Sequence, residues 1–306
     1  MNKIVSLKRS LHQKFAIKDL GKLNYFLGIE MATSQNGLFL NQRKYVLDLL
    51  QEVNMLDCKL VTTPLDNKLM LDTAGELLTH ISYYQRLVGK LIYLTITRPD
   101  IAYAVSLVSQ FMHAPTVTHL HVVKRILRYL KGSIGRGILM RNNGSTQIQG
   151  YTDANWADNA LDRKSTTGYC TFMGGNLVTW KNKKQNVIAR SSAEAEYRAM
   201  ASTACELIWL KNLLFDLGFP SNAPMSLMCD NQAAMHIASN PVFHERIKHI
   251  EVDCHYVRAQ VQSKVIQTLF TRNHDQLADL FTKALPTTHF QHLFGKLGSI
   301  NLMDPT

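Results

Sequence analysis

The first half of the chain is patterned mainly for helices. Residues 3–15 carry apolar side chains at intervals of three and four, which is the spacing of one helical face. The stretch LGKLNYFLGIEMATSQNGLFLNQ predicts two strands around the turn QNG, and a helix follows near 42–53. A polar connector over 66–79 leads to a helical pattern over 82–130 that prolines interrupt.

After Gly144 the pattern changes to short strands. Four segments are typical of strands separated by turns: TQIQGYTDA, TTGYCTFMG, NLVTWKNK and QNVIARS. A long helix is predicted over 193–217, closed by Gly218 and Pro220. MSLMCDNQAAMHIAS then predicts a strand that runs into a helix, VIQTLFTRN another strand and DQLADLFTKAL another helix. This order predicts an α/β fold with a mixed sheet and flanking helices.

Composition narrows the class of protein. The chain has 306 residues, 46% of them hydrophobic, and a formal net charge of +11, which suits a polyanionic partner such as nucleic acid. Its five cysteines are widely spread without a CxxC pair, which argues against a disulfide framework and for a reducing compartment. The start is not typical of a signal peptide, and no apolar run is long enough to span a bilayer. We therefore expect an intracellular protein of the cytoplasm and/or nucleus, not secreted and without a membrane partner.

Three aspartates stand at predicted element ends in apolar surroundings. Asp153 lies near the end of the first strand of the second half, Asp230 follows the strand SLMC, and Asp279 lies within QLADLFTKAL. Each alone could be a cap or a surface carboxylate. Together they would repel one another unless a cation neutralised them, and oxygen-only ligands suit Mg²⁺ or Mn²⁺. Two such ions can support hydrolysis of a phosphodiester.

Helical phase distinguishes two neighbouring glutamates in SSAEAEYRAM. Glu196 lies at the head of an apolar stripe that must face the sheet, formed by Met200, Thr203, Leu207, Leu210 and Leu214. Glu194 points about 160° away and stands four residues before Arg198, which predicts an exposed ion pair. Because a buried unpaired glutamate is costly, the pattern favours Glu196 as a metal ligand beside Asp153 and Asp230.

Two groups of basic residues are candidates for nucleic-acid contacts. One lies on a predicted amphipathic helix and comprises Lys124, Arg128 and Lys131; the other lies in a predicted turn and comprises Lys181, Lys183 and Lys184. Such residues can bind the phosphate backbone, but an ordinary solvated face or turn explains them equally well.

Long ordered motifs of the second half resemble a known family. YTDANWADNALDRKSTTGY, ARSSAEAEYRAMA, CDNQAAMHIASNPVFHERIKHIEVDCHYVR and QLADLFTKAL resemble the ribonuclease H domain of copia-type LTR-retrotransposon Pol polyproteins. KDLGKLNYFLGIE, CKLVTTPLD, LVGKLIYLTITRPDIAYAVSLVSQFM and HVVKRILRYLKGS resemble the reverse transcriptase of the same polyprotein, after its active site.

The resemblance implies a ribonuclease H-like fold that binds two Mg²⁺ ions, for which Mn²⁺ can substitute. It implies hydrolysis of the RNA strand of RNA–DNA hybrids, leaving a 3′-hydroxyl and a 5′-phosphate. By motif, Asp153 is the first-strand ligand that bridges both metals, and Glu196, Asp230 and Asp279 are the other three ligands. His274, five residues before Asp279, corresponds to a mobile histidine that shuttles protons in many ribonucleases H.

The resemblance also predicts the domain organisation. Residues 1–75 would be the end of the reverse transcriptase palm and its thumb, 76–145 a helical connection, 146–286 the ribonuclease H-like domain and 287–306 a tail. The polymerase motif Tyr-x-Asp-Asp is missing from the chain, so polymerisation by this chain alone is not expected. Expected partners are an RNA–DNA hybrid and a separate polymerase part of the polyprotein. The alternative is a catalytically silent nucleic-acid-binding remnant of a degenerate insertion.

Overall fold

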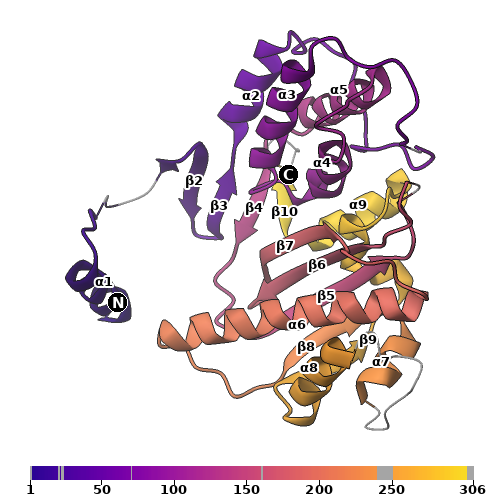
Figure 1. Ribbon diagram of the computed structural model, residues 1–306. Helices are drawn as coiled ribbons and strands as arrows, with labels where there is room; N and C mark the ends of the chain where they lie inside the picture. Colours follow the sequence, from indigo (N-terminus) through magenta and orange to yellow (C-terminus); the bar gives the residue numbers. More distant parts are fainter. Residues whose placement is uncertain are drawn as a thin grey trace.

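The chain folds around two five-stranded sheets (Figure 1). The computed structural model describes residues 2–19, 21, 24–69, 71–159, 161–239 and 251–301. The first sheet is antiparallel, in the order β1 (Tyr25–Phe26), β2 (Ile29–Ser34), β3 (Gly37–Asn41), β4 (Arg136–Met140) and β10 (Ser299–Asn301). The second has the order β7 (Asn176–Lys184), β6 (Thr166–Met173), β5 (Ile148–Asn155), β8 (Met225–Cys229) and β9 (Ile266–Phe270).

The second sheet is mixed and lies between two layers of helices. Strand β5 pairs antiparallel with β6, and β6 with β7, whereas β5–β8 and β8–β9 are parallel. One face is covered by α6 (Ser192–Asp216), α7 (Gln232–Ser239) and α8 (Glu251–Gln262), whose apolar side chains form a core with β5, β8 and β9. The sequence pattern predicted this mixed sheet and its long helix.

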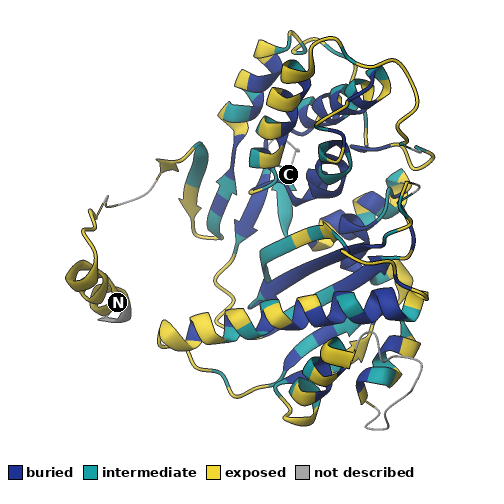
Figure 2. Cartoon of the chain, in the orientation of Figure 1, coloured by how far each residue is buried: buried dark blue, intermediate teal, exposed yellow. Residues whose placement is uncertain are grey.

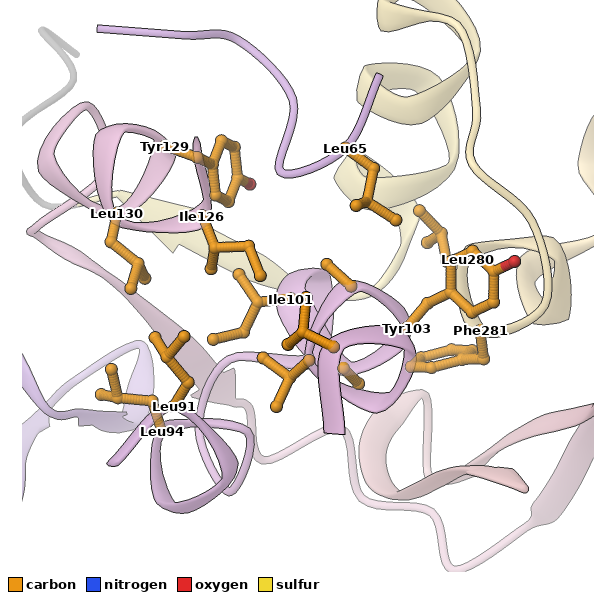
Figure 3. Close-up of a cluster of buried hydrophobic side chains, with 14 of the residues drawn as sticks. Leu65, Leu91, Leu94, Ile101, Tyr103, Ile126, Tyr129, Leu130, Leu280 and Phe281 are labelled. Atoms are coloured by element: carbon orange, nitrogen blue, oxygen red, sulfur yellow. The ribbon is translucent and has the colours of Figure 1, made fainter. Parts of the chain in front are cut away.

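The other face of that sheet packs on the helices that accompany the first sheet and on segments that follow β9 in the chain. These are α2 (Arg43–Glu52), α3 (Ile81–Leu94), α4 (Ala102–Ser109), α5 (Val117–Lys131) and α9 (Thr287–Lys296), with the 3₁₀ helices η1 (Pro99–Ile101) and η4 (Leu277–Phe281). A third 3₁₀ helix, η3 (Asn273–Asp275), precedes η4 and has no buried residue. Figure 3 shows where they meet: Leu280 and Phe281 of η4 lie beside Tyr103 and Leu65. The predicted connection and the predicted ribonuclease H-like domain therefore share one hydrophobic core.

Helix α1 (Asn2–Lys14) stands apart from both sheets (Figure 1). Its predicted apolar face is exposed, at Ile4, Leu7, Leu11 and Phe15 (Figure 2). An apolar stripe on a helix normally covers a partner surface. Within the described residues, this stripe meets solvent instead.

Strand β6 is buried along almost its whole length, and a glycine in it sets the position of η4. A Cβ atom on Gly168 would lie 2.5 Å from Cγ2 of Thr282 and 2.9 Å from Cβ of Phe281. Only glycine lets the η4 segment approach β6 so closely. Because Gly168 pairs with Asp153 across β5 and β6, this close approach brings the η4 segment next to Asp153.

Four segments differ from the sequence expectations. Residues 136–140 of the expected helical connection form strand β4, which pairs with β3 in the first sheet. QNVIARS, expected as a strand, is a loop over 185–191: Val187 and Ile188 are both exposed, so it lacks the alternating burial of a strand. DQLADLFTKAL, expected as a helix, folds as the 3₁₀ helices η3 and η4, because its tight packing on Gly168 leaves only short helical turns. Residues 287–301 of the expected tail form α9 and β10, and β10 completes the first sheet by pairing with β4.

Candidate active site

Four carboxylates gather at one edge of the mixed sheet. The register of β5 and β8 pairs Tyr151 with Met228, so two residues further along Asp153 comes opposite Asp230. Carboxylate oxygens of Asp153, Asp230 and Asp279 all lie within 4.8 Å of one another. Ligand atoms of Asp230, Glu196 and Cys229 also lie within 4.8 Å of one another. The structure therefore brings together all four carboxylates expected from the sequence.

Asp153 lies at the centre of the group and is 1% exposed. The hydroxyl of Thr282 donates a hydrogen bond to its Oδ2. Its Oδ1 lies 3.1 Å from Nζ of Lys283. Asp153 is thus held from two sides by the residues that directly follow η4.

Asp279 is contributed by η4 and is also buried. Its Oδ1 lies 2.7 Å from Nζ of Lys283, one helical turn further along the chain. Burial, followed by the charge of Asp153, raises the pKa of Asp279 to about 7, and Lys283 opposes this increase. A further cation beside Asp279 would therefore stabilise its ionised carboxylate.

Glu196 enters the group from the first turns of α6, which begins after the N-cap Ser191. It is 6% exposed, and burial, followed by the charges of Asp153 and Asp230, raises its pKa to about 9. Its Oε2 is buried without a hydrogen-bond partner. The apolar stripe predicted behind it is buried against the sheet, so the helical phase predicted from the sequence is confirmed.

Asp230 directly follows β8, at the bend before α7. Burial raises its pKa, the charge of Asp153 raises it further, and Lys283 opposes this increase. Its Oδ1 is a second buried oxygen without a hydrogen-bond partner. Two such oxygens beside raised carboxyl pKa values fit a site that takes a hard divalent cation, since Mg²⁺ prefers oxygen ligands.

Glu194 forms the expected ion pair, with its Oε1 3.1 Å from Nη2 of Arg198. The expectation that this pair is exposed was wrong, because Glu194 is 4% exposed. The loop 185–191 covers it, and the backbone N–H of Arg190 donates to its Oε2 over 2.8 Å.

Lys283 is a residue of the group that the sequence analysis missed. Its ammonium bridges Asp153 and Asp279; burial lowers its pKa, but these two carboxylates raise it by more. The signal that could have identified it is a lysine four residues after an acidic candidate in a helical segment. Its positive charge partly neutralises the carboxylates of Asp153 and Asp279.

His274 lies in η3, and its ring is stacked with that of His289 and tilted by 46° against that of His292, both on α9. The proton-shuttle role that the resemblance implies for it stays a prediction.

The lysines of β7 line a groove of about 920 Å³ between β6, β7, α6 and α8. Lys181, Lys183 and Lys184 share it with Arg198 and with aromatic side chains that include Trp209. Lys184 also forms an ion pair of 2.8 Å with Asp162. The expected turn is thus the end of an edge strand. It is part of a basic groove, in which four cationic side chains outnumber the acidic Glu206 and Asp253 and aromatic side chains are also present.

The second basic group lies on α5, one of the helices that accompany the first sheet. Arg128 is exposed, whereas Nζ of Lys131 donates to the carbonyl oxygen of Cys58 over 3.3 Å and Lys124 is half-buried. Its nucleic-acid role stays a prediction.

The class of protein follows from the topology and the site. Three antiparallel strands followed by two parallel ones, with a long helix across the sheet and carboxylates at the ends of β5 and β8, form a ribonuclease H-like fold. Structural comparison finds an RNase H1 isolated from compost, with 13% identity, a TM-score of 0.35 and coverage of 45% of this chain and 93% of that chain. The same enzyme in complex with an RNA/DNA hybrid has a TM-score of 0.33 and 13% identity, covering 44% of this chain and 94% of that chain.

Sequence comparison identifies the family. Residues 1–67 match the family model "Reverse transcriptase (RNA-dependent DNA polymerase)". The chain is 46% identical over 290 residues to the Pol polyprotein from transposon RE1 of Arabidopsis thaliana, covering 94% of this chain and 20% of the relative. It is 37% identical over 298 residues to that from transposon TNT 1-94 of Nicotiana tabacum, covering 94% and 22%. Close homologues of the chain, over most of its length, are copia-type retrotransposon Pol polyproteins.

The chain spans about a fifth of the length of these Pol polyproteins. Among the described residues, no helix is both long and apolar enough to cross a membrane.

Proposed function

We propose that this chain hydrolyses the RNA strand of RNA–DNA hybrids, dependent on two Mg²⁺ ions for which Mn²⁺ can substitute. The observation that carries the proposal is the group of four carboxylates, three of them buried and Asp230 half-buried, in which Glu196 and Asp230 each have a buried oxygen without a hydrogen-bond partner. The family and the fold support it. We infer an intracellular site of action, in the cytoplasm and/or nucleus.

Asp153, Glu196, Asp230 and Asp279 would hold the two ions. When bound, the ions supply a water activated for attack and stabilisation of the leaving oxygen, which yields a 3′-hydroxyl and a 5′-phosphate. Thr282 fixes the orientation of Asp153 through its hydrogen bond, and the packing of η4 on Gly168 fixes the backbone of Asp279. These contacts position two of the four carboxylates in the absence of substrate.

The basic groove would bind the nucleic-acid backbone beside the carboxylates. The groove and the carboxylates share helix α6, which contributes Arg198 to the groove and Glu196 to the carboxylates. Trp209, half-exposed in the same groove, offers a ring for stacking. A hybrid would be recognised by its A-form shape and 2′-hydroxyls more than by its sequence.

A polymerase part of a longer polyprotein is the second proposed partner. It is supported by the match of residues 1–67 to the reverse transcriptase model and by the exposed apolar stripe of α1.

The direct test incubates the purified chain with end-labelled RNA in a hybrid, as single-stranded RNA and as double-stranded RNA. Each substrate is tested with Mg²⁺, with Mn²⁺ and with EDTA. We expect cleavage of the hybrid RNA alone, and only with metal. Hybrid binding without turnover under both metals would support the silent remnant instead.

Replacing groove lysines should weaken hybrid binding. We expect Lys181→Ala combined with Lys183→Ala to lower affinity several-fold and to reduce the slope of log K against log salt by about 1 for each phosphate that the protein no longer neutralises. Fluorescence anisotropy across a salt series measures both quantities. Lys211→Ala on α6, which does not line the groove, is the matched control. An unchanged slope in the double variant would remove these lysines from the interface.

Replacing Lys283 should show whether its ammonium competes with a metal ion for the carboxylates of Asp153 and Asp279. Its side chain is 33% exposed, and we expect Lys283→Met in EDTA to lose about 1–3 kcal/mol of unfolding free energy. Mg²⁺ should bind about tenfold more tightly, because one cation fewer occupies the carboxylate oxygens. Denaturant unfolding and calorimetric titration measure these effects. Lys44→Met breaks the exposed Lys44–Asp48 pair of the same i,i+4 spacing and should change neither. Weaker Mg²⁺ binding by Lys283→Met would contradict the competition.

A further inference from the structure

Three histidines and an aspartate form a second cluster, on the surface between η3 and α9. His274 and Asp275 come from η3, and His289 and His292 from α9. Oδ1 of Asp275 lies 3.2 Å from Nε2 of His292 and 3.4 Å from Nδ1 of His274. The ring centroids of His274 and His292 are 4.1 Å apart. The cluster thus joins two segments of the chain through imidazole rings and one carboxylate.

The ligand atoms are already close to the spacing of a metal site. One nitrogen of His274, one nitrogen of His292 and one carboxylate oxygen of Asp275 all lie within 4.8 Å of one another. Bonds of about 2.1 Å in a tetrahedral zinc site place ligand atoms about 3.4 Å apart. Small rotations of the three side chains would reach this geometry. All three are partly or largely exposed, so an ion can enter from solvent.

We propose that His274, Asp275 and His292 form a surface binding site for a divalent transition metal ion of the zinc class. His289 lies next to this set, with its ring centroid 5.5 Å from that of His274, and it or a water would fill the fourth position. Imidazole nitrogens favour zinc-like ions over Mg²⁺, so this site differs in chemistry from the all-oxygen carboxylate group.

The ammonium of Lys296 occupies part of this site in its metal-free form. Its Nζ lies 2.5 Å from Oδ1 of Asp275, at the oxygen that a metal would take. The side chain of Lys296 is 44% exposed, so it can swing into solvent when an ion arrives. Its presence lowers metal affinity and does not block the site.

A metal here would fasten α9 to η3. Helix α9 leads directly into β10 of the first sheet, whereas η3 follows β9 of the second. The ion would therefore tie the two sheets together through polar residues that lie outside the hydrophobic core.

The test is calorimetric titration of the whole chain with ZnCl₂ in excess Mg²⁺, which reduces competition by the carboxylate group. We expect one Zn²⁺ per chain at micromolar affinity, weakened at least about tenfold by His274→Ala with His292→Ala. Lys296→Met should tighten binding. His255→Ala, an exposed histidine on α8, is the matched control and should bind like the parent.

Circular dichroism checks that the double variant folds, and Asp275→Asn provides a second, milder loss of a ligand. With Co²⁺ as the probe, the parent should show the visible absorption bands of a tetrahedral site and the double variant should lack them. Absence of Zn²⁺ binding by the parent, or equal binding by the folded double variant, would overturn the proposal. Because no arm measures RNA cleavage, its failure is separate from failure of the proposed nuclease.

Discussion

Asp153→Asn should reduce cleavage of the RNA strand of a hybrid by about a thousandfold or more, which is about 4 kcal/mol of transition-state stabilisation. Asparagine keeps the size of the side chain and removes its negative charge. The change therefore acts on the residue whose oxygens lie among those of Asp230 and Asp279. Glu196→Gln should lose a comparable factor. Single-turnover assays with end-labelled RNA measure the rate directly.

Stability separates this loss from simple unfolding. The carboxylates repel one another, since the charges of Asp153 and Asp230 both raise the pKa of Glu196. Asp153→Asn removes a charge that repels its neighbours but also its ion pair with Lys283, and Glu196→Gln resembles the protonated carboxyl that burial favours, so both variants should still fold cooperatively in EDTA. Asp216→Asn, an exposed carboxylate at the end of the same helix α6, should keep full activity. Activity of Asp153→Asn within threefold of the parent would falsify the assignment of the site.

The sequence predicted the parts of this site that depend on periodicity. The hydrophobic pattern of the strands predicted that Asp153 and Asp230 stand at strand ends. The helical period of α6 predicted that Glu196 faces the same edge of the sheet. The roles of these residues in catalysis stay predictions. The mixed sheet followed from the order of elements for the same reason.

Tertiary packing decided what the sequence could not show. The burial of Glu194 depends on the loop 185–191, which the sequence analysis took for a strand because QNVIARS has a strand-like pattern. The position of Lys283 depends on how closely η4 approaches Gly168, although the two segments lie more than 100 positions apart in the chain. Helix α9 and strand β10 were missed because β10 is only three residues long and takes its place by pairing with β4.

In EDTA, the stability of the metal-free protein should fall as the pH rises from about 4.5 to about 9. Burial is the main reason that the pKa of Glu196 is raised from 4.5 to about 9 and that of Asp279 from 3.8 to about 7. The folded state therefore holds these protons more tightly than the unfolded chain. The resulting stabilisation is complete below the unfolded pKa values and is lost as the pH passes the folded ones. Because a tenfold difference in proton affinity corresponds to about 1.4 kcal/mol, each of the two carboxyls contributes a loss on the order of 5 kcal/mol.

Denaturant unfolding at a series of pH values measures this curve. Glu196→Gln cannot titrate and should flatten it, leaving the smaller slope from Asp279. Saturating Mg²⁺ should reverse the trend, because the ion binds the ionised carboxylates and so stabilises the folded state more as they lose their protons. A flat curve for the parent in EDTA, or the same slope in Glu196→Gln, would show that Glu196 is ionised in the metal-free protein. The carboxylate group would then need compensation beyond Lys283, and its case as a metal site would weaken accordingly.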